Sequence, residues 1–424
     1  MRTLQSGVGW KAAAAAALLF FISTWVHFPP PDPQAVEGWP LLDIGPVALG
    51  PPWVLSGDSP HYLLMARSLA EDGDLDLADD YQSARRGGGQ AGHLLRGRAL
   101  DPHAERDDRG RLLPTHAPAL SLVLALLSWP LAFSLWFEPW CIWLNMCAAL
   151  ACLAWMAKRL PQAAPDVGGW RTHPVMLLAF ATPFWCYSRD LWTEPWTALA
   201  WLGLLFLKHP AALLAAGLAG TLIKYPFALV PAAMGAWALW RGRRSRATAL
   251  LASSALGLAA GVGLTQWIYR DFSDHFSLFH SGIHARFDWP FEGMAGLLLS
   301  PESGLLFFFP ILLWPLAGLL GGNHASRPQS SASRREAIWG LAAFFLVHAA
   351  YEDWGGGTGF SARYLVPALP LLLLYGRERL AFPRLYLATL LYSVFWAVVG
   401  GMAPALVYER SPWGVLIHIV DSLT

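Results

Sequence analysis

Residues 139–159 read PWCIWLNMCAALACLAWMAKR, an apolar run that ends in two adjacent basic side chains. The run from Pro139 to Ala157 has close to the roughly 20 residues that an α-helix needs to cross the hydrocarbon core of a bilayer. Lys and Arg collect on the cytoplasmic side of membrane proteins, so Lys158 and Arg159 predict that this helix ends in the cytoplasm. The direction of this helix sets the orientation of the segments before and after it.

The composition of the whole chain agrees with a membrane protein. Of its 424 residues, 55% are hydrophobic and 14% are charged, whereas a soluble domain carries about 25% charged residues. The formal net charge of +1 argues against nucleic acid as a partner. The cysteines lie in apolar runs without disulfide or metal-ligand spacing, and we expect small buried side chains at Cys141, Cys147, Cys152 and Cys186.

Basic residues gather in short connections between apolar runs. The positive-inside rule places these connections in the cytoplasm, together with the N-terminus. They are Lys158 to Arg171, Arg241 to Arg246, Arg327 to Arg335 and Arg377 to Arg384.

The apolar segment from His116 to Phe137 does not fit this alternation as a crossing helix. A crossing there would move the basic end of residues 139–159 to the outside. We therefore predict a re-entrant or interfacial segment, which suits Pro118, Pro130 and the Trp residues nearby. The remaining runs give about eleven transmembrane helices. They are Trp10 to Phe28, Pro139 to Ala157, Pro174 to Tyr187, Trp192 to Leu207, Ala211 to Ile223, Tyr225 to Trp240, Ala247 to Tyr269, Gly304 to Leu320, Ala337 to Tyr351, Tyr364 to Tyr375 and Leu385 to Ala403.

These segments predict an all-α polytopic membrane protein with one transmembrane domain, residues 1–424. A large first extracytoplasmic loop, residues 29–138, is expected to contain juxtamembrane or re-entrant helices. The first span resembles a signal peptide, but Pro29-Pro30-Pro31 follows it in place of a small-residue cleavage site, so we expect an uncleaved anchor. No inverted repeat of the transporter kind is evident.

The predicted topology gathers polar residues on the extracytoplasmic face. The stretch Gly57-Asp58-Ser59-Pro60-His61-Tyr62 lies in the first loop, and Glu194, Lys224 and Arg363 lie at the outer ends of apolar runs. Ionisable groups at membrane depth are costly and usually mark function. The cytoplasmic connections are short and basic, so we expect the functional site on the outer face.

Asp58 and Glu194 are the candidate catalytic residues. A carboxylate can take a proton from an acceptor hydroxyl or amine during group transfer. The alternative is that Asp58 only caps the helix predicted from Pro60 to Ala70. Capping and catalysis are compatible roles.

Lys224 and Arg363 are candidate phosphate ligands. Arg binds a phosphate through its planar fork, and Lys binds it as a point charge. The alternative is that both side chains only extend to the membrane interface. The run Gly355-Gly356-Gly357 permits close backbone approach or simply forms a turn, and Trp354 beside it suits a sugar or phosphate platform.

No metal is expected from the sequence. The external histidines show no metal-ligand spacing along one helix, so we favour structural or hydrogen-bonding roles over zinc for His61, His93, His103, His116, His275, His280 and His284. The stretch Asp72-Gly73-Asp74-Leu75-Asp76 hints at a hard-cation site but lacks the later ligands of such loops. A divalent cation remains an open alternative without support from spacing.

The ordered motifs resemble those of polytopic GT-C glycosyltransferases, of the family-39-like kind that uses polyprenyl-phosphate sugars. The resemblance covers about Trp10 to Tyr375. Its segments are Gly57 to Tyr62, Asp72 to Leu77, His116-Ala117-Pro118-Ala119-Leu120, Leu191 to Pro195, Ile223-Lys224-Tyr225-Pro226, Ser303 to Leu306, Trp354 to Gly356 and Arg363-Tyr364-Leu365.

This resemblance implies an acceptor base at Asp58, a supporting carboxylate at Glu194, and contacts of Lys224 and Arg363 with the lipid phosphate. The same motifs supply further expected substrate-binding residues, which are His61, Tyr62, His116, Tyr225, Trp354 and Tyr364. The chain departs from the family pattern where members often carry an acidic residue, here Ser59, and at Ala117 and Ala119. These departures weaken the metal-dependent version of the reaction.

We therefore expect an inverting hexosyl- or pentosyltransferase in the inner (plasma) membrane of a bacterium, with its active site extracytoplasmic. Its partners would be a polyprenyl-phosphate-linked sugar, membrane lipids, and a glycan, lipid or protein acceptor. The alternatives are a non-catalytic transporter or flippase for a lipid-linked amphiphile, and a structural membrane subunit.

Overall fold

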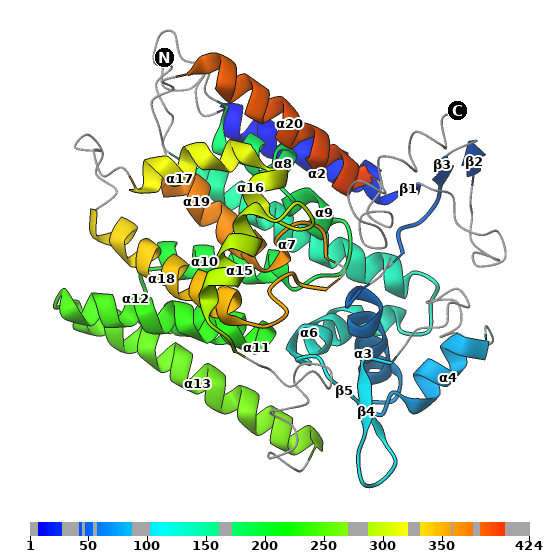
Figure 1. Ribbon diagram of the computed structural model, residues 1–424. Coiled ribbons are helices and arrows are strands. Elements are labelled where there is room, and N and C mark those ends of the chain that lie inside the picture. The colour runs from blue at the N-terminus through cyan, green and yellow to red at the C-terminus, as the bar shows by residue number, and fades with distance from the viewer. Residues whose placement is uncertain are drawn as a thin grey trace.

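The computed structural model describes residues 7–27, 42–44, 47–53, 57–86, 102–160, 172–269, 287–320, 331–357, 359–375 and 382–402. This part of the chain is predominantly helical (Figure 1). The α-helices are α2 (Gly7–Thr24), α3 (Ser59–Glu71), α4 (Ala78–Arg86), α6 (Ala119–Ser128), α7 (Phe137–Arg159), α8 (Pro174–Phe180), α9 (Phe184–Ser188), α10 (Glu194–Phe206), α11 (Pro210–Ile223), α12 (Leu229–Trp240), α13 (Arg244–Tyr269), α15 (Pro290–Leu299), α16 (Leu305–Phe308), α17 (Leu313–Leu320), α18 (Ser331–Ala350), α19 (Leu369–Tyr375) and α20 (Pro383–Met402).

Short elements complete the described fold. The 3-10 segments are η2 (Trp129–Leu131), η3 (Tyr225–Ala228), η4 (Pro310–Leu312) and η5 (Arg363–Ala368). The strands are β1 (Val26–His27), β2 (Leu42–Ile44), β3 (Val47–Leu49), β4 (Ala104–Arg106) and β5 (Leu112–Pro114). Strands β1, β3 and β2 pair antiparallel, as do β4 and β5. The all-α prediction omitted these strands because runs of two or three residues carry no usable alternation of polar and apolar side chains.

The predicted transmembrane segments are helical, but prolines interrupt several of them. Residues 174–187 form α8 and α9 on either side of Pro183, and residues 304–320 form α16, η4 and α17 around Pro310. Proline lacks the backbone N–H that would continue the helical ladder. Within the described ranges, α7, α13 and α20 are long and apolar enough to cross a bilayer.

The packing of α2 against α7 bears on the predicted topology. Gly9 of α2 lies close to both Ala157 of α7 and the ring of His173 at the start of α8. The beginning of α2 and the end of α7 therefore share one end of the molecule. Helix α6 has 10 residues, which is about half the length that a bilayer crossing needs. That segment 116–137 does not cross the membrane stays a prediction, which the short length of α6 favours.

Cysteine labelling tests the predicted cytoplasmic location of Lys158. Because Lys158 is exposed at the basic end of α7, a Lys158→Cys variant should resist a membrane-impermeant thiol reagent applied to intact cells. The matched positive control is Arg109→Cys, at an exposed position in the first loop. Both need a Cys147→Ala background, because Cys147 is exposed and not buried as its apolar surroundings predicted. Strong labelling at position 158 in intact cells would contradict the topology.

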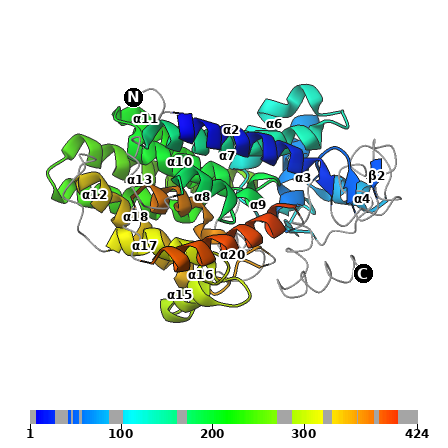
Figure 2. The same cartoon turned by 90° about the horizontal axis from the view of Figure 1, so that it is seen from above.

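Figures 1 and 2 place the described part of the first loop at one end of the molecule, where α3, α4, α6 and the β4–β5 hairpin lie together. Helix α3 packs on α6, and buried Leu63, Leu64, Leu120 and Leu124 form part of a shared apolar cluster. The cluster continues to Phe137 at the start of α7. The first loop is thus built onto the helical bundle through its own hydrophobic core.

A group of charged side chains lies where the end of α10, the start of α13 and the first half of α18 meet. Glu336 of α18 is fully buried and forms ion pairs with Arg243, in the connection between α12 and α13, and with Arg246, in the first turn of α13. The Nη2 of Arg246 also donates a 2.7 Å hydrogen bond to the carbonyl oxygen of Leu204 in α10. One carboxylate therefore links three helices.

We expect Glu336→Ala to lower the free energy of unfolding by about 3 kcal/mol. This is the lower end of the range for breaking a buried pair, because Arg243 and Arg246 are 32% and 19% exposed and are partly screened by solvent. Chemical unfolding in detergent micelles measures the change, and Glu302→Ala is the control because Glu302 is exposed. Equal stability of the two variants would exclude a structural role for Glu336.

Candidate functional site

Asp58 lies directly before α3, where Pro60 in the first turn suits the fixed backbone angle of a helix start. Asp58 occupies the N-cap position, but its side chain makes no capping hydrogen bond. Instead, Nη1 of Arg363 donates a hydrogen bond to Asp58 Oδ2 at 2.9 Å. The carboxylate therefore faces a charged partner from the far end of the chain and does not act as a helix cap.

Buried polar contacts fix the start of α3 beside the segment that leads into α10. Ser59 Oγ lies 2.6 Å from Asp190 Oδ1 and accepts a hydrogen bond from the backbone N–H of Leu191 at 2.9 Å. Asn145 of α7 donates its side-chain amide to the carbonyl oxygen of Asp190. These groups are buried, so water does not compete for them. The network brings the Asp58 region next to the start of α10.

Arg363 begins η5 and follows a turn with left-handed backbone angles. Gly356 has φ 76°, Gly357 has φ 61° and Ser361 has φ 56°. Glycine adopts such angles without steric cost, whereas Ser361 carries local strain of the kind that clusters at functional sites. A Cβ on Gly359 would lie 3.1 Å from Arg363 Cδ, so the absence of a side chain there leaves room for the arginine.

Aromatic rings flank the Arg363 guanidinium. Its Cζ lies 4.9 Å from the ring centroid of Trp192 and 5.1 Å from that of Tyr364. These are cation–π distances, and such rings hold a guanidinium in place without neutralising its charge. The side chain is only 11% exposed, so it does not reach out to the membrane interface as a snorkelling residue would.

Glu194 and Lys224 form a second ion pair at the same end of the bundle. Glu194 is the first residue of α10 and is 1% exposed, and Lys224 sits at the break between α11 and η3. Lys224 Nζ donates to Glu194 Oε1 at 2.9 Å and lies 4.9 Å from the centroid of the Tyr364 ring. The Tyr364 ring therefore contacts both cations, Lys224 and Arg363.

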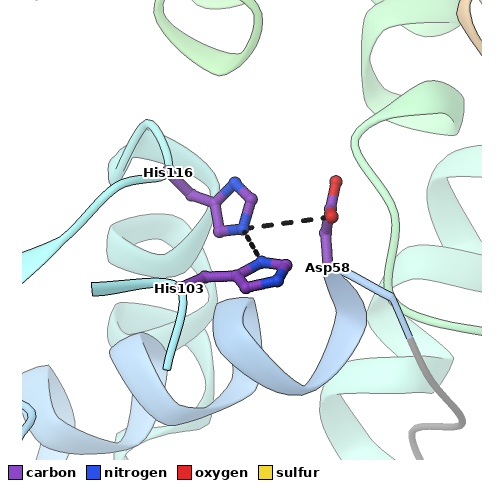
Figure 3. A group of neighbouring side chains, drawn as sticks. All are labelled: Asp58, His103 and His116. Carbon is purple, nitrogen blue, oxygen red and sulfur yellow. Dashed lines mark hydrogen bonds and ion pairs between the residues drawn. The ribbon is translucent and has the colours of Figure 1, made fainter. Parts of the chain in front are cut away.

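Two histidines of the first loop, His103 and His116, lie on the side of Asp58 that carries its other oxygen (Figure 3). His116 Nε2 lies 4.0 Å from Asp58 Oδ1 and 2.9 Å from His103 Nδ1. His61 stacks on His103, with ring centroids 3.8 Å apart, and its Nδ1 lies 2.5 Å from Tyr81 Oη. The described histidines of this loop thus form one group beside the carboxylate.

The charges around Asp58 control its ionisation. Burial alone would raise the pKa of Asp58, but the Arg363 guanidinium and the neighbouring histidines, led by His116, hold this pKa well below its usual range. Asp58 is therefore a carboxylate at neutral pH. Burial lowers the pKa of His61 well below its ordinary value, and His103 and His116 act in the same direction.

The structure brings most of the sequence-predicted residues together. Asp58, Glu194, Lys224, Arg363, Tyr364, His61 and His116 are joined by the contacts above, and the ring of Tyr62 lies 5.1 Å from that of His116. The described contacts of Tyr225 and Trp354 are with helix surfaces. Tyr225 lies against Gly261 of α13, and Trp354 lies against Gly296 of α15. His93, His275, His280 and His284 lie outside the described residues.

The acidic stretch after α3 forms a turn. Asp74 Oδ1 accepts the N–H of Asp76, and Asp76 Oδ1 accepts those of Ala78 and Leu112. Asp80 is buried, and burial together with nearby acidic groups raises its pKa to about 7. These side chains therefore organise the backbone, and the hard-cation reading of this stretch receives no support from their contacts.

Sequence reasoning missed several residues of the site. It did not single out the Ser59–Asp190 contact, the Trp192 ring over Arg363, or Tyr81 behind His61. The signal available for Trp192 and Asp190 was their place beside Glu194 in one polar connection. The pairing of Ser59 with Asp190 spans 131 positions and leaves no local pattern.

The chain was compared with protein-family models and with curated proteins. No family model matches the chain, and no curated protein matches it.

Proposed function

We propose that this chain is a polytopic membrane glycosyltransferase with about eleven crossings, and that it acts on the extracytoplasmic side of a bacterial inner membrane. It transfers a sugar from a polyprenyl-phosphate-linked donor to a hydroxyl or amine acceptor. The observation that carries the proposal is the joining of two ion pairs, Asp58–Arg363 and Glu194–Lys224, across the Tyr364 ring. These groups come from four separate segments that meet at one end of the bundle.

The two cations are the proposed ligands of the lipid phosphate. Arg363 and Lys224 are 11% and 12% exposed, so a phosphate that reaches them leaves bulk water and meets two positive charges in a weakly screened setting. Arg supplies a planar fork and Lys a point charge. The resting ion pairs keep these charges compensated until the donor arrives.

Donor binding then prepares the base. A phosphate that draws Arg363 away from Asp58 Oδ2 removes the main cause of the low pKa of Asp58. The carboxylate becomes more basic at the moment when the donor is in place. This coupling predicts ordered binding, with the donor before deprotonation of the acceptor.

The chemical step is a single displacement. Asp58 takes the proton of the acceptor, the acceptor oxygen or nitrogen forms a bond to the anomeric carbon, and the bond from that carbon to the phosphate oxygen breaks. The bonding electron pair leaves with the lipid phosphate, where Arg363 and Lys224 stabilise the added charge. Attack from the face opposite the leaving phosphate inverts the anomeric centre. Glu194 holds Lys224 in position through the 2.9 Å bond.

Purified protein in liposomes tests the proposal. The donors are polyprenyl-phosphate sugars with a radiolabelled hexose or pentose, and the product is free polyprenyl phosphate together with a labelled acceptor. Release of polyprenyl phosphate in proportion to protein supports transfer. Movement of a fluorescent lipid-linked sugar between leaflets without chemical change would instead support the flippase alternative and overturn the proposal.

A further inference from the structure

We propose that His103, His116 and Asp58 form a binding site for one divalent transition-metal ion of the zinc class. Each residue offers one ligand atom, and these atoms all lie within 4.8 Å of one another. His116 Nε2 is the atom that faces both His103 Nδ1 and Asp58 Oδ1. Figure 3 shows the two imidazole rings and the carboxylate converging from different segments. The site goes beyond the proposed sugar transfer, because metal binding requires neither donor nor acceptor. An ion on Asp58 Oδ1 competes with a proton for that oxygen, so in the metal-loaded protein Asp58 is a ligand and not the free base.

The distances between the ligand atoms fit such an ion. Zinc binds histidine nitrogen and carboxylate oxygen at about 2.0–2.2 Å, so two ligands of a tetrahedral ion lie roughly 3.3 Å apart. The separations of His116 Nε2 from His103 Nδ1 and from Asp58 Oδ1 are 2.9 Å and 4.0 Å, on either side of that value. Bringing the three atoms onto one coordination sphere therefore requires His116 Nε2 and Asp58 Oδ1 to approach each other by about 0.7 Å.

The fold holds the two histidines at the open end of a hairpin. His103 directly precedes β4 and His116 follows β5 by two residues, so pairing of these strands sets their separation. Thr115 strengthens this end, since its N–H and its hydroxyl both donate to the carbonyl oxygen of His103, at 2.9 and 3.0 Å. Behind the site, Tyr81 Oη accepts the backbone N–H of His103 at 3.2 Å.

The hydrogen bond from Arg363 orients Asp58, the third ligand. Arg363 binds Asp58 Oδ2, which leaves Oδ1 directed toward His116. Hydrogen bonds of this kind to a ligating carboxylate are the usual means of fixing metal ligands. All three ligand residues are partly exposed, so an ion can enter from solvent.

The donor set selects the class of metal. Two imidazoles and one carboxylate suit zinc and similar transition metals, whereas calcium and magnesium prefer sites built of oxygen. Three protein ligands leave a fourth position for water or a substrate oxygen, as in catalytic zinc sites. Sequence spacing did not reveal the site because one ligand lies directly before α3 and the other two flank the β4–β5 hairpin at its open end.

Cobalt titration of the chelator-treated full-length protein in detergent tests the site. Cobalt in a tetrahedral nitrogen and oxygen site gives visible ligand-field bands, and zinc should displace it. We expect one equivalent in the wild type. We expect His103→Ala and His116→Ala to lose the bands and to bind zinc at least 10- to 100-fold more weakly. Loss of a group that only hydrogen-bonds to a metal ligand already costs about this much, so loss of a ligand itself should cost at least as much. His209→Ala is the control, since His209 is exposed at the start of α11.

A second pair of variants guards against misfolding. His103→Asn and His116→Gln place an amide near Nδ1 and Nε2 respectively, so they keep a hydrogen-bonding group while supplying a poor metal ligand. They should behave like the alanine variants in the titration but melt like the wild type. Folded wild-type protein without a cobalt band, or equal zinc affinity in the wild type and these variants, overturns the site. Zinc binding without sugar transfer would leave the site standing and reject only the proposed function.

Discussion

Asp58→Asn is expected to reduce sugar transfer by about 10²- to 10⁴-fold, the usual effect of losing a general base. The change is isosteric, and the amide oxygen of asparagine can still accept the hydrogen bond that Arg363 Nη1 donates to Asp58 Oδ2. The fold should therefore stay intact. Affinity for a polyprenyl-phosphate analogue should be equal or higher, because binding the phosphate no longer requires Arg363 to break an ion pair with a charged carboxylate. Single-turnover assays with a saturating donor measure the chemical step directly.

The control for this variant is Asp79→Asn. Asp79 is an exposed carboxylate in α4 of the same loop, so its loss changes the local charge equally without touching the site. Wild-type turnover is expected for Asp79→Asn. Turnover of Asp58→Asn within a factor of two of the wild type would remove Asp58 from the chemical step.

The parts of this molecule that local sequence determines were predictable. Each apolar run that was expected to be a span is helical in the described structure, because length and hydropathy are properties of neighbouring residues. Helix α7 runs from Phe137 to Arg159, close to the predicted 139–157. The interruptions at Pro183 and Pro310 were missed because a proline inside an apolar run predicts a kink or a break but does not say which.

The assembled site was predictable only as a list of residues on one face. The rule that basic connections stay in the cytoplasm placed Asp58, Glu194, Lys224 and Arg363 at the same end, and their contacts agree with that. The pairing itself depends on segments 305 positions apart for Asp58 and Arg363, and no local pattern specifies it. The same holds for His103, whose partner is set by the register of the β4–β5 hairpin.

Loss of either cation is expected to weaken donor binding more than acceptor binding. Lys224→Ala and Arg363→Ala each remove one charge-assisted bond to the phosphate, worth roughly 1.5–3 kcal/mol. At about 1.4 kcal/mol per decade, the affinity falls about 10- to 100-fold. Arg363→Lys should restore only part of it, because an ammonium reproduces neither the planar fork nor the stacking between the Trp192 and Tyr364 rings.

Titration with a polyprenyl-phosphate analogue, beside thermal unfolding of each variant, separates phosphate binding from a structural role. Lys208→Ala is the matched control, since Lys208 is exposed beyond the far end of α10. If the two ion pairs are purely structural, Lys224→Ala and Arg363→Ala lower the melting temperature and leave the affinity for the analogue unchanged. Unchanged affinity in both Lys224→Ala and Arg363→Ala would remove the phosphate clamp, and the case for a lipid-linked donor would lose its main support. Weaker affinity in both, with Lys208→Ala unaffected, would place the lipid phosphate between the two ion pairs, where its arrival frees Asp58 to act.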